Sequence, residues 1–420
     1  MKRKINKDNK LSFGRDKKMR DKKFTFMEMF VGAGGSHLGF KKQGDFQTLL
    51  VSDINDDMCK TFKENNKEVP EVICGDIHNL SGKDLMKKTN LKMGELDAIF
   101  GGVVCKGFSL AGVRSSSDPR NDLYKKYISL VEEMQPKVAI IENVPGMASM
   151  VIKNGHEFSK KEQEEINDAW GKLKKLNGLK SSIRKGQASQ EQIKEAEEIE
   201  SKKEEYRKLI KKGSTDVITD IKRLYKKAGY NVLEPKILDA SYYGAATSRR
   251  RLIIIAIRKD LDSTRFEFPP RTHVKLKTVE EVFKKINYNK KDIDNQPMNH
   301  NDKSRERFSY IPEGKNIVTV MDKLPKHLKI SKFYSRGCTM RLARDKPAPT
   351  LVPGHSNFPV HPVENRSITV REAACLMGFP QDYKFIGSHT RRCEQVGQAV
   401  VVEMAEALAN VTSKFLKNQN

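Results

Sequence analysis

The sequence predicts an α/β protein built on a doubly wound, mostly parallel sheet. Between Phe24 and Arg258, short apolar segments alternate with segments of helical periodicity, which is the pattern of a parallel sheet with helices on both faces. We expect strands near residues 26–31, 47–52, 71–74, 97–101, 137–141, 231–238 and 251–257. Open sheets of this class bind their ligands at the carboxyl ends of the strands, so functional side chains are expected there.

The first expected strand leads into a glycine-rich turn. Phe26–Phe40 reads Phe-Met-Glu-Met-Phe-Val-Gly-Ala-Gly-Gly-Ser-His-Leu-Gly-Phe. Gly32, Gly34 and Gly35 let the backbone approach a ligand closely and leave free amides there. Such a turn is a weak signal when it stands alone.

The second and third expected strands end in acidic residues, at Asp53 and Asp76. An acid at the end of a strand is well placed to bond ribose hydroxyls. Either aspartate could instead cap a helix. The order of the strands favours the binding role.

The fourth expected strand runs into Gly101–Ser109, which presents Cys105 on a loop. Most free cysteines are small buried hydrophobes, so this residue alone does not indicate a nucleophile. The next apolar strand ends in Glu142-Asn143, and the last follows a run of arginines that contains Arg249 and Arg251. Together these segments offer a thiol, a carboxylate and two guanidinium groups at strand ends.

In this order, the segments resemble the DNA cytosine-5 methyltransferase family. The motifs that carry the resemblance are Phe30-x-Gly-x-Gly34, Cys105-x-Gly-Phe-Ser109, Glu142-Asn143-Val144, Arg249-x-Arg251 and Gly397-Gln-Ala-Val400. The resemblance covers about two-thirds of the chain, and an ordered set is far more specific than any single motif. It implies the Rossmann-like fold of S-adenosylmethionine-dependent methyltransferases, with a smaller, irregular target-recognition domain.

The resemblance implies methyl transfer from S-adenosylmethionine to C5 of a flipped cytosine in duplex DNA, which leaves S-adenosylhomocysteine and requires no metal. Cytosine C5 is a poor nucleophile, so a thiolate must first add to C6, and Cys105 is the candidate. Glu142 is expected to act at N3 of the base, and Asn143 to orient the loop. Arg249 and Arg251 are expected to stabilise charge on the base. A duplex hides C6, so the base must leave the stack.

The family also implies which residues bind the cofactor and the DNA. The expected cofactor-binding residues are Phe30, Gly32, Gly34, Gly35, Asp53, Ile54, Asp76, Ile77, Gly101, Asn121, Leu123, Gln398 and Val400. The expected DNA-binding residues follow the cysteine and are Lys106, Ser109 and Arg114.

Three motifs depart from the usual family pattern. Val103–Lys106 reads Val-Val-Cys-Lys where the family usually has Pro-Pro-Cys-Gln, Val401–Val402 replaces a Pro-Pro pair, and Thr247 stands where glutamine is common. Valine restores an amide donor that proline lacks and loosens the loop. These changes keep open a catalytically weakened DNA-binding member of the fold, and a tRNA cytosine-5 methyltransferase is a further alternative.

The chain divides into four parts. Residues 1–23 hold 11 Lys/Arg against 3 Asp, and this composition predicts a disordered basic arm. We expect a catalytic and cofactor-binding domain at 24–258, a target-recognition region at 259–340, and closing motifs at 341–420 whose last helix returns to the catalytic domain.

A charge-dense segment, residues 153–213, interrupts the catalytic domain. It contains two capping-box patterns, Ser159-x-x-Glu162 and Ser189-x-x-Gln192, and apolar residues at helical spacing, which predict an inserted helical hairpin. The sequence leaves open whether this hairpin grips DNA, binds another protein or is only a solvated protrusion.

The composition limits the class of protein. Lys plus Arg outnumber Asp plus Glu by 79 to 54, which favours a nucleic-acid partner, although an AT-rich genome also yields lysine-rich proteins. The six cysteines show no disulfide or zinc spacing, which indicates a reducing compartment, and His355 and His361 read as structural or surface residues. No apolar run has membrane length. We expect a cytoplasmic monomer that binds double-stranded DNA, either with a cognate restriction endonuclease as partner or as a solitary or phage-borne enzyme.

Overall fold

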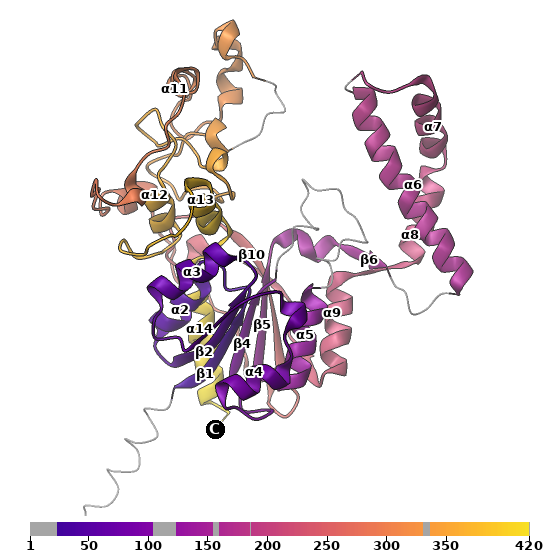
Figure 1. The fold of residues 1–420 in the computed structure, drawn as a ribbon, viewed down its shortest axis with the longest axis vertical. Helices are drawn as coiled ribbons and strands as arrows, with labels where there is room; N and C mark the ends of the chain where they lie inside the picture. Colours follow the sequence, from indigo (N-terminus) through magenta and orange to yellow (C-terminus); the bar gives the residue numbers. More distant parts are fainter. Residues whose placement is uncertain (1–22, 104–122, 154–158, 185, 331–336, 420) are drawn as a thin grey trace, which may run out of the picture.

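The computed structural model describes residues 23–103, 123–153, 159–184, 186–330 and 337–419 (Figure 1). Its centre is an eight-stranded sheet in the order β3-β2-β1-β4-β5-β10-β8, with β9 also pairing β10. The strands are β1 (Phe24–Met29), β2 (Phe46–Asp53), β3 (Glu71–Cys74), β4 (Ala98–Gly102), β5 (Val138–Asn143), β8 (Tyr230–Val232), β9 (Lys236–Asp239) and β10 (Arg250–Arg258). The predicted α/β class with a mostly parallel sheet is confirmed.

The strands β1 to β5 run parallel, whereas β10 runs antiparallel to β5. One strand was expected over 231–238, but the structure has two, β8 and β9, and both are antiparallel to β10. Pro235 lies between them. Proline has no N–H for the ladder, so the strand breaks there.

Alternate residues of each central strand face two separate cores. Phe26, Phe100 and Ile140 belong to one apolar cluster, which includes residues of helices α2 (Gly35–Gln43) and α14 (Val402–Lys417). Met27 and Ile99 belong to the other cluster, which includes residues of α4 (Gly82–Thr89), α5 (Leu123–Met134) and α9 (Val217–Lys227). The period of two along each strand therefore buries both faces of the sheet.

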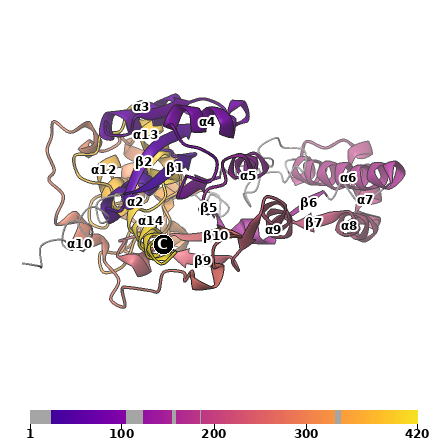
Figure 2. The ribbon, with the colours of Figure 1, turned by 90° about the horizontal axis from the view of Figure 1, so that it is seen from below.

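The insertion contains three helices rather than the two of the expected hairpin. They are α6 (Lys160–Arg184), α7 (Gln190–Ser201) and α8 (Lys203–Lys212), and they project from the β5 side of the sheet (Figures 1 and 2). Two short antiparallel strands, β6 (Val151–Lys153) and β7 (Ser214–Asp216), lead out to the helices and back. Both predicted capping boxes form, at Ser159 and at Ser189.

A smaller lobe lies on the opposite side, above β1 and β2 in Figure 1. It contains the short helices α10 (Val279–Phe283), α11 (Asp302–Ser309), α12 (Val370–Leu376) and α13 (His389–Gln398). Its own apolar cluster joins residues 308–328 to Val360. This cluster therefore extends past residue 340, where the sequence had placed the end of the recognition region.

Helix α14 closes the chain by packing along α2, where Lys42 Nζ lies 2.7 Å from Glu406 Oε2. The C-terminus thereby returns to the sheet that the N-terminal part of the chain builds. Within the described ranges, no helix is both long and apolar enough to cross a membrane.

Candidate active site

Glu142 and Arg251 form a buried ion pair at the carboxyl end of β5. The antiparallel register places Leu252 opposite Asn143 and Ile253 opposite Glu142, so Arg251 lies just beyond the end of β5. Its Nε lies 2.7 Å from Glu142 Oε1. Glu142 is 7% exposed and Arg251 is 9% exposed. Taking water away from both groups strengthens their interaction and holds the carboxylate in one orientation.

Arg249, which the sequence suggested as a second catalytic arginine, is held by backbone carbonyls in the structure. Its Nη1 donates to the carbonyl of Leu351 at 2.9 Å, and its Nη2 donates to the carbonyl of Gly397 at 2.8 Å. The side chain is 3% exposed, and burial lowers the pKa of its guanidinium well below the usual range. Arg249 thus joins the start of β10 to the closing segments, while Arg251 forms the ion pair with Glu142.

Asn143 fixes the backbone around the site. Its Nδ2 donates to the carbonyl of Val103 at 3.3 Å, and its Oδ1 accepts from the N–H of Val144 at 2.7 Å. Val103 directly follows β4 and is the last described residue before the gap. The predicted residues Cys105, Lys106, Ser109, Arg114 and Asn121 lie outside the described residues.

The glycine-rich turn after β1 has an unusual backbone. Gly32 and Gly34 have φ angles of +57° and +92°, and Phe30 has φ of +59°, a region that L-residues with side chains rarely adopt. At Gly34 a Cβ atom would lie 2.8 Å from the Tyr383 hydroxyl, so a larger residue does not fit. Left-handed backbone at the end of a strand is a common sign of a ligand site.

Asp53 holds this turn from the end of β2. Its Oδ2 accepts from the N–H of Gly32 at 2.8 Å, and its Oδ1 accepts from the N–H of Asn55 at 2.8 Å. Burial raises the pKa of the Asp53 carboxyl, against the lowering effect of these hydrogen bonds. Each carboxylate oxygen keeps further acceptor capacity for a hydroxyl donor.

Two neighbouring strand ends complete this edge. Ile54 is 67% exposed, and Asp76 caps a short 3-10 helix by accepting from the N–H of His78 at 2.9 Å. Ile77, also predicted to contact the cofactor, is buried in the core beside α4 and α5.

The closing segment around Val400 lies directly against the glycine turn. A Cβ atom at Gly35 would come within 2.1 Å of the Val400 carbonyl oxygen, so only glycine permits this approach. Gln398 is exposed, whereas Val401 and Val402 are buried. The valines that depart from the family pattern thus pack in the interior.

Two further predicted cofactor-binding residues have packing roles in the structure. A Cβ atom at Gly101 would lie 2.6 Å from the ring of Tyr127, which explains glycine there. Leu123 begins α5 and packs, partly buried, on the core.

Sequence reasoning missed Glu28, which lies fully buried in the middle of β1. Burial raises its pKa to about 8, and its Oε1 accepts a hydrogen bond from the Ser36 hydroxyl at the start of α2. An acidic residue inside the apolar run Phe-Met-Glu-Met-Phe was the available signal. Tyr383 was missed as well, and its hydroxyl donates to the carbonyl of Ala33 in the glycine turn.

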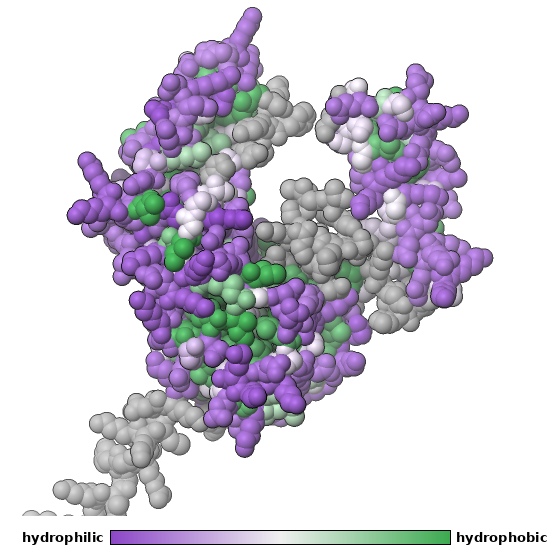
Figure 3. All heavy atoms as spheres, viewed as in Figure 1, coloured by the Kyte–Doolittle hydropathy of each residue, from purple (hydrophilic) through white to green (hydrophobic). Residues whose placement is uncertain are grey.

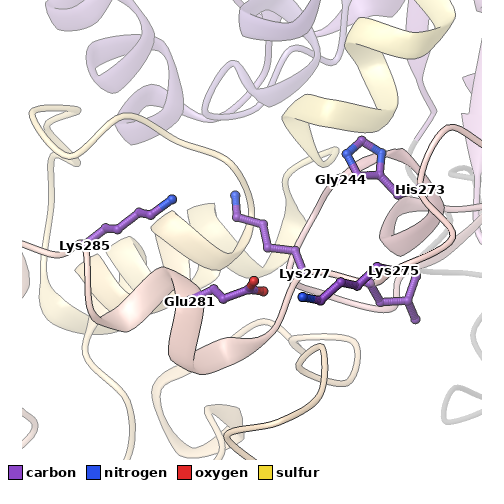
Figure 4. A pocket seen from close by; sticks show the side chains of 7 residues that line it. Gly244, His273, Lys275, Lys277, Glu281 and Lys285 are labelled. Atoms are coloured by element: carbon purple, nitrogen blue, oxygen red, sulfur yellow. The ribbon is translucent and has the colours of Figure 1, made fainter.

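A separate basic hollow lies beside α10. Figure 4 shows Lys275, Lys277 and Lys285 around Glu281. None of the predicted site residues lines it, so it is not part of the candidate active site. Across the ranges that the structure describes, no group of His, Cys, Asp and Glu side chains is arranged to hold a metal ion.

Comparison with known proteins decides the family. The model of the C-5 cytosine-specific DNA methylase family matches residues 24–167 and 203–414, which include the glycine turn, the Glu142–Arg251 pair and the closing segment. The chain belongs to this family. Members are S-adenosylmethionine-dependent methyltransferases that act on cytosine C5 in DNA.

Curated relatives agree with this assignment. The Type II methyltransferase M1.HphI of Haemophilus parahaemolyticus is 27% identical over 404 residues, covering 94% of this chain and 88% of its own length. The Type II methyltransferase M.Eco47II of Escherichia coli is 27% identical over 413 residues, covering 96% and 82%. A solved structure described as a DNA modification methyltransferase of an Escherichia coli prophage shares the fold, with a TM-score of 0.61, 21% identity, and coverage of 94% and 99%.

The strand ends described above fit the methyl donor of this methyltransferase family. Asp53 has the acceptor capacity that ribose hydroxyls require, and the exposed Ile54 offers an apolar surface for a flat base. Among the described residues, a Cβ atom at Gly32 would meet only Met58 Sδ, at 3.8 Å, which leaves space beside the backbone there. These are the chemical features needed to hold an adenosyl group.

Proposed function

We propose that this chain is the modification methyltransferase of a restriction–modification pair. It methylates C5 of one cytosine within a specific sequence of duplex DNA, through a covalent bond between Cys105 and C6 of the flipped base. The observation that carries the proposal is the buried Glu142–Arg251 pair at the carboxyl end of β5. The neighbouring strand β4 leads in sequence to Cys105.

Cys105 supplies the nucleophile in this proposal. Its thiolate adds to C6, a new S–C bond forms, and the electron pair of the C5–C6 double bond becomes available at C5. S-Adenosylmethionine supplies the methyl group, activated by its sulfonium. Loss of the C5 proton then restores the double bond and expels the thiolate, so the enzyme returns to its starting state.

Glu142 and Arg251 stabilise the charge that the thiolate places on the ring. Glu142 holds a proton at N3 of the cytosine. Arg251 keeps that carboxylate in place through Nε, and Nη2 is available for the base carbonyl, because no described residue accepts a hydrogen bond from it. Hydrogen-bond donors that are already positioned in a site without water stabilise a developing charge more than the same donors do in water.

The cofactor lies across the ends of β1, β2 and β3 in this proposal. Asp53 accepts from the ribose hydroxyls, Ile54 packs on the adenine and Asp76 accepts from its amino group. The Type II names of the relatives support a cognate endonuclease as partner. We further propose that the enzyme acts as a monomer in the bacterial cytoplasm.

The test is methyl transfer from labelled S-adenosylmethionine to unmethylated duplex DNA, followed by bisulfite sequencing of the product. We expect label at C5 of one cytosine in a short recurring sequence. Glu142→Gln should lower kcat by about 10²–10⁴-fold, the usual contribution of a positioned acid or base. It should leave the affinity for S-adenosylhomocysteine unchanged, because Glu142 lies at the base and not at the adenosyl group.

Two controls separate the alternatives. Cys105→Ser should abolish transfer, and Arg250→Lys, on the exposed face of the same strand as Arg251, should not change it. DNA binding without any transfer by the unsubstituted chain would replace the proposal with the weakened DNA-binding member of the fold. Transfer to tRNA and not to duplex DNA would also overturn it.

A further inference from the structure

The helices α6, α7 and α8, here called the arm, lie only partly within the ranges that match the family model. The family match ends at residue 167 and resumes at 203, so it omits most of α6 and the whole of α7, whereas α8 is matched. The catalytic sheet and the smaller lobe lie entirely within the matched ranges. The family match therefore does not explain most of α6 or α7, and their role has to be inferred from the residues of the arm itself.

The arm is stabilised mainly by its own contacts. Leu176, Leu179, Ala196 and Ile199 form a small buried cluster between α6 and α7. Ion pairs such as Lys175–Glu195 and Lys180–Glu200 tie the same two helices together. A helix of 25 residues spans about 37 Å at 1.5 Å per residue. The arm is thus a long projection whose outer surface is free for another purpose.

The charges on the arm are segregated. From Ala169 to its end, α6 carries Lys172, Lys174, Lys175, Lys180 and Arg184 and has no acidic residue. The first nine residues of α6 carry four acidic residues, and α7 carries five acidic residues against one lysine. Three of these cations pair within the arm, Lys172 with Asp168, Lys175 with Glu195 and Lys180 with Glu200, whereas Lys174 and Arg184 have no described carboxylate partner.

The basic half of α6 lies on the side of the arm that faces the rest of the molecule. In Figure 1 the tip of the arm places α6 nearer to the smaller lobe and α7 farther away. Figure 3 shows an open hollow between the arm and that lobe. The candidate site connects to both parts: after β5 the chain leads through β6 to the arm, and Arg249 donates a hydrogen bond to Gly397 in α13 of the smaller lobe.

We propose that the arm is a second DNA-binding element, which grips the phosphate backbone of the substrate duplex from the side opposite the smaller lobe. The proposal rests on the proposed function for the identity of the duplex. Lys174 and Arg184 are exposed, and neither pairs with a described carboxylate, so both can bind phosphate. Contacts of this kind position the duplex without reading its sequence.

The surface of the arm favours DNA over a protein partner. Stable protein interfaces are built around apolar and aromatic side chains. On the described part of the arm, the exposed large apolar residues are Ile183 and Ile193, each only 38% exposed. Polyanion binding by contrast needs Lys and Arg on one side, which the arm has.

The first test measures binding of a fluorescent duplex of arbitrary sequence at several salt concentrations. Each phosphate contact contributes about 0.9 to the slope of log K against log salt. The double variant Lys174→Gln/Arg184→Gln should therefore lower that slope by about 1.8. Its matched control is Lys160→Gln/Lys161→Gln, which removes the same charge from the exposed acidic half of the same helix and should leave the slope unchanged.

The second test removes the arm. Lys153 pairs with Ser214 across β6 and β7, and Asn-Gly is a sequence favoured in two-residue hairpin turns. Deleting residues 156–213 should therefore let Asn154-Gly155 connect the two strands as a short hairpin turn. The shortened protein should keep its affinity for S-adenosylhomocysteine, bind the duplex more weakly and protect a shorter stretch of DNA from nuclease digestion.

The outcomes separate this proposal from the proposed function. Unchanged salt slope, affinity and protected length in both variants, with methyl transfer intact, would overturn the arm proposal alone. Weaker DNA binding by both variants supports the arm even if the unsubstituted chain transfers no methyl group. An equal fall of the salt slope in the two double variants would also overturn the arm proposal. It would show that the lost charge weakens DNA binding in general and that Lys174 and Arg184 make no local contact.

Discussion

The Arg249 guanidinium donates a hydrogen bond to the carbonyl of Gly397, which lies 148 positions later in the chain. A second bond from the same group goes to Leu351. The start of β10, the segment around Leu351 and the end of α13 therefore meet at one buried guanidinium. This joint holds the closing segment next to the glycine turn, where Val400 contacts Gly35.

Replacing Arg249 with methionine should loosen that joint. The carbonyls of Leu351 and Gly397 would lose their donor, and each buried group left without a partner costs about 1–3 kcal/mol. We expect a lower free energy of unfolding in urea, together with weaker binding of S-adenosylhomocysteine. Arg250→Met, one residue away on the exposed face, is the control. Equal stability of the two variants would contradict the role given to Arg249.

Replacing Asp53 with asparagine should weaken cofactor binding. An amide offers one acceptor oxygen, and its NH₂ group would face the N–H of Gly32 or Asn55 with donor against donor. We expect the Kd for S-adenosylhomocysteine, measured by calorimetry, to rise about 10- to 100-fold, as for the loss of a charged hydrogen bond. Asp56→Asn, on the exposed start of α3 (Asp56–Asn65), should bind normally. A normal Kd in Asp53→Asn would remove Asp53 from the site.

Glu28 should make the protein less stable as the pH rises. Burial raises its pKa from 4.5 to about 8, so the folded protein keeps a proton that the unfolded chain releases. Below pH 4.5 both the folded and the unfolded state hold the proton. Above pH 4.5 the contribution of Glu28 to the free energy of unfolding falls by at most about 1.4 kcal/mol per pH unit, until the pH reaches the pKa of the folded state.

The variant Glu28→Gln removes this titration. Its Tm should fall less between pH 5 and pH 8 than that of the unsubstituted protein, measured by thermal melting. Glu165→Gln, at an exposed position on α6, should behave like the unsubstituted chain. The same pH dependence in all three proteins would show that Glu28 does not titrate in this range.

Replacing Gly35 with alanine should separate the closing segment from the glycine turn. The new methyl group would meet the Val400 carbonyl at 2.1 Å, and relieving that overlap costs about 1–3 kcal/mol. Stability should drop and S-adenosylhomocysteine should bind more weakly. Gly171→Ala, in the middle of α6 with open space around it, should be neutral or slightly stabilising. If Gly35→Ala also proves neutral, the two segments do not pack as described.

The elements found from the sequence were those with a local pattern. The apolar run before Glu142, the glycines after Phe30 and the acid at Asp53 each follow directly from a strand, so their places at the sheet edge were predictable. Pro235 explains why one expected strand became two. The arm was expected from its capping boxes, but the break between α7 and α8 was not.

Arg249, directly before β10, and Arg251 within it show where sequence reasoning stops. Residues two apart on a strand share a face, so Arg249 and Arg251 are equivalent in the sequence pattern. In the structure Arg251 meets Glu142, while Arg249 meets carbonyls from residues 351 and 397. No local rule predicts which backbone segment comes near a given side chain.

The sequence by itself determined the fold class, the order of the motifs and the chemical groups at the strand ends, because strand periodicity and turn residues act over a few neighbouring positions. Only the tertiary structure decided which guanidinium pairs with the catalytic carboxylate candidate, that Ile77 belongs to the core, and that Gly35 makes room for Val400. Those facts depend on contacts between residues that are up to several hundred positions apart, and folding of the whole chain is what brings them together.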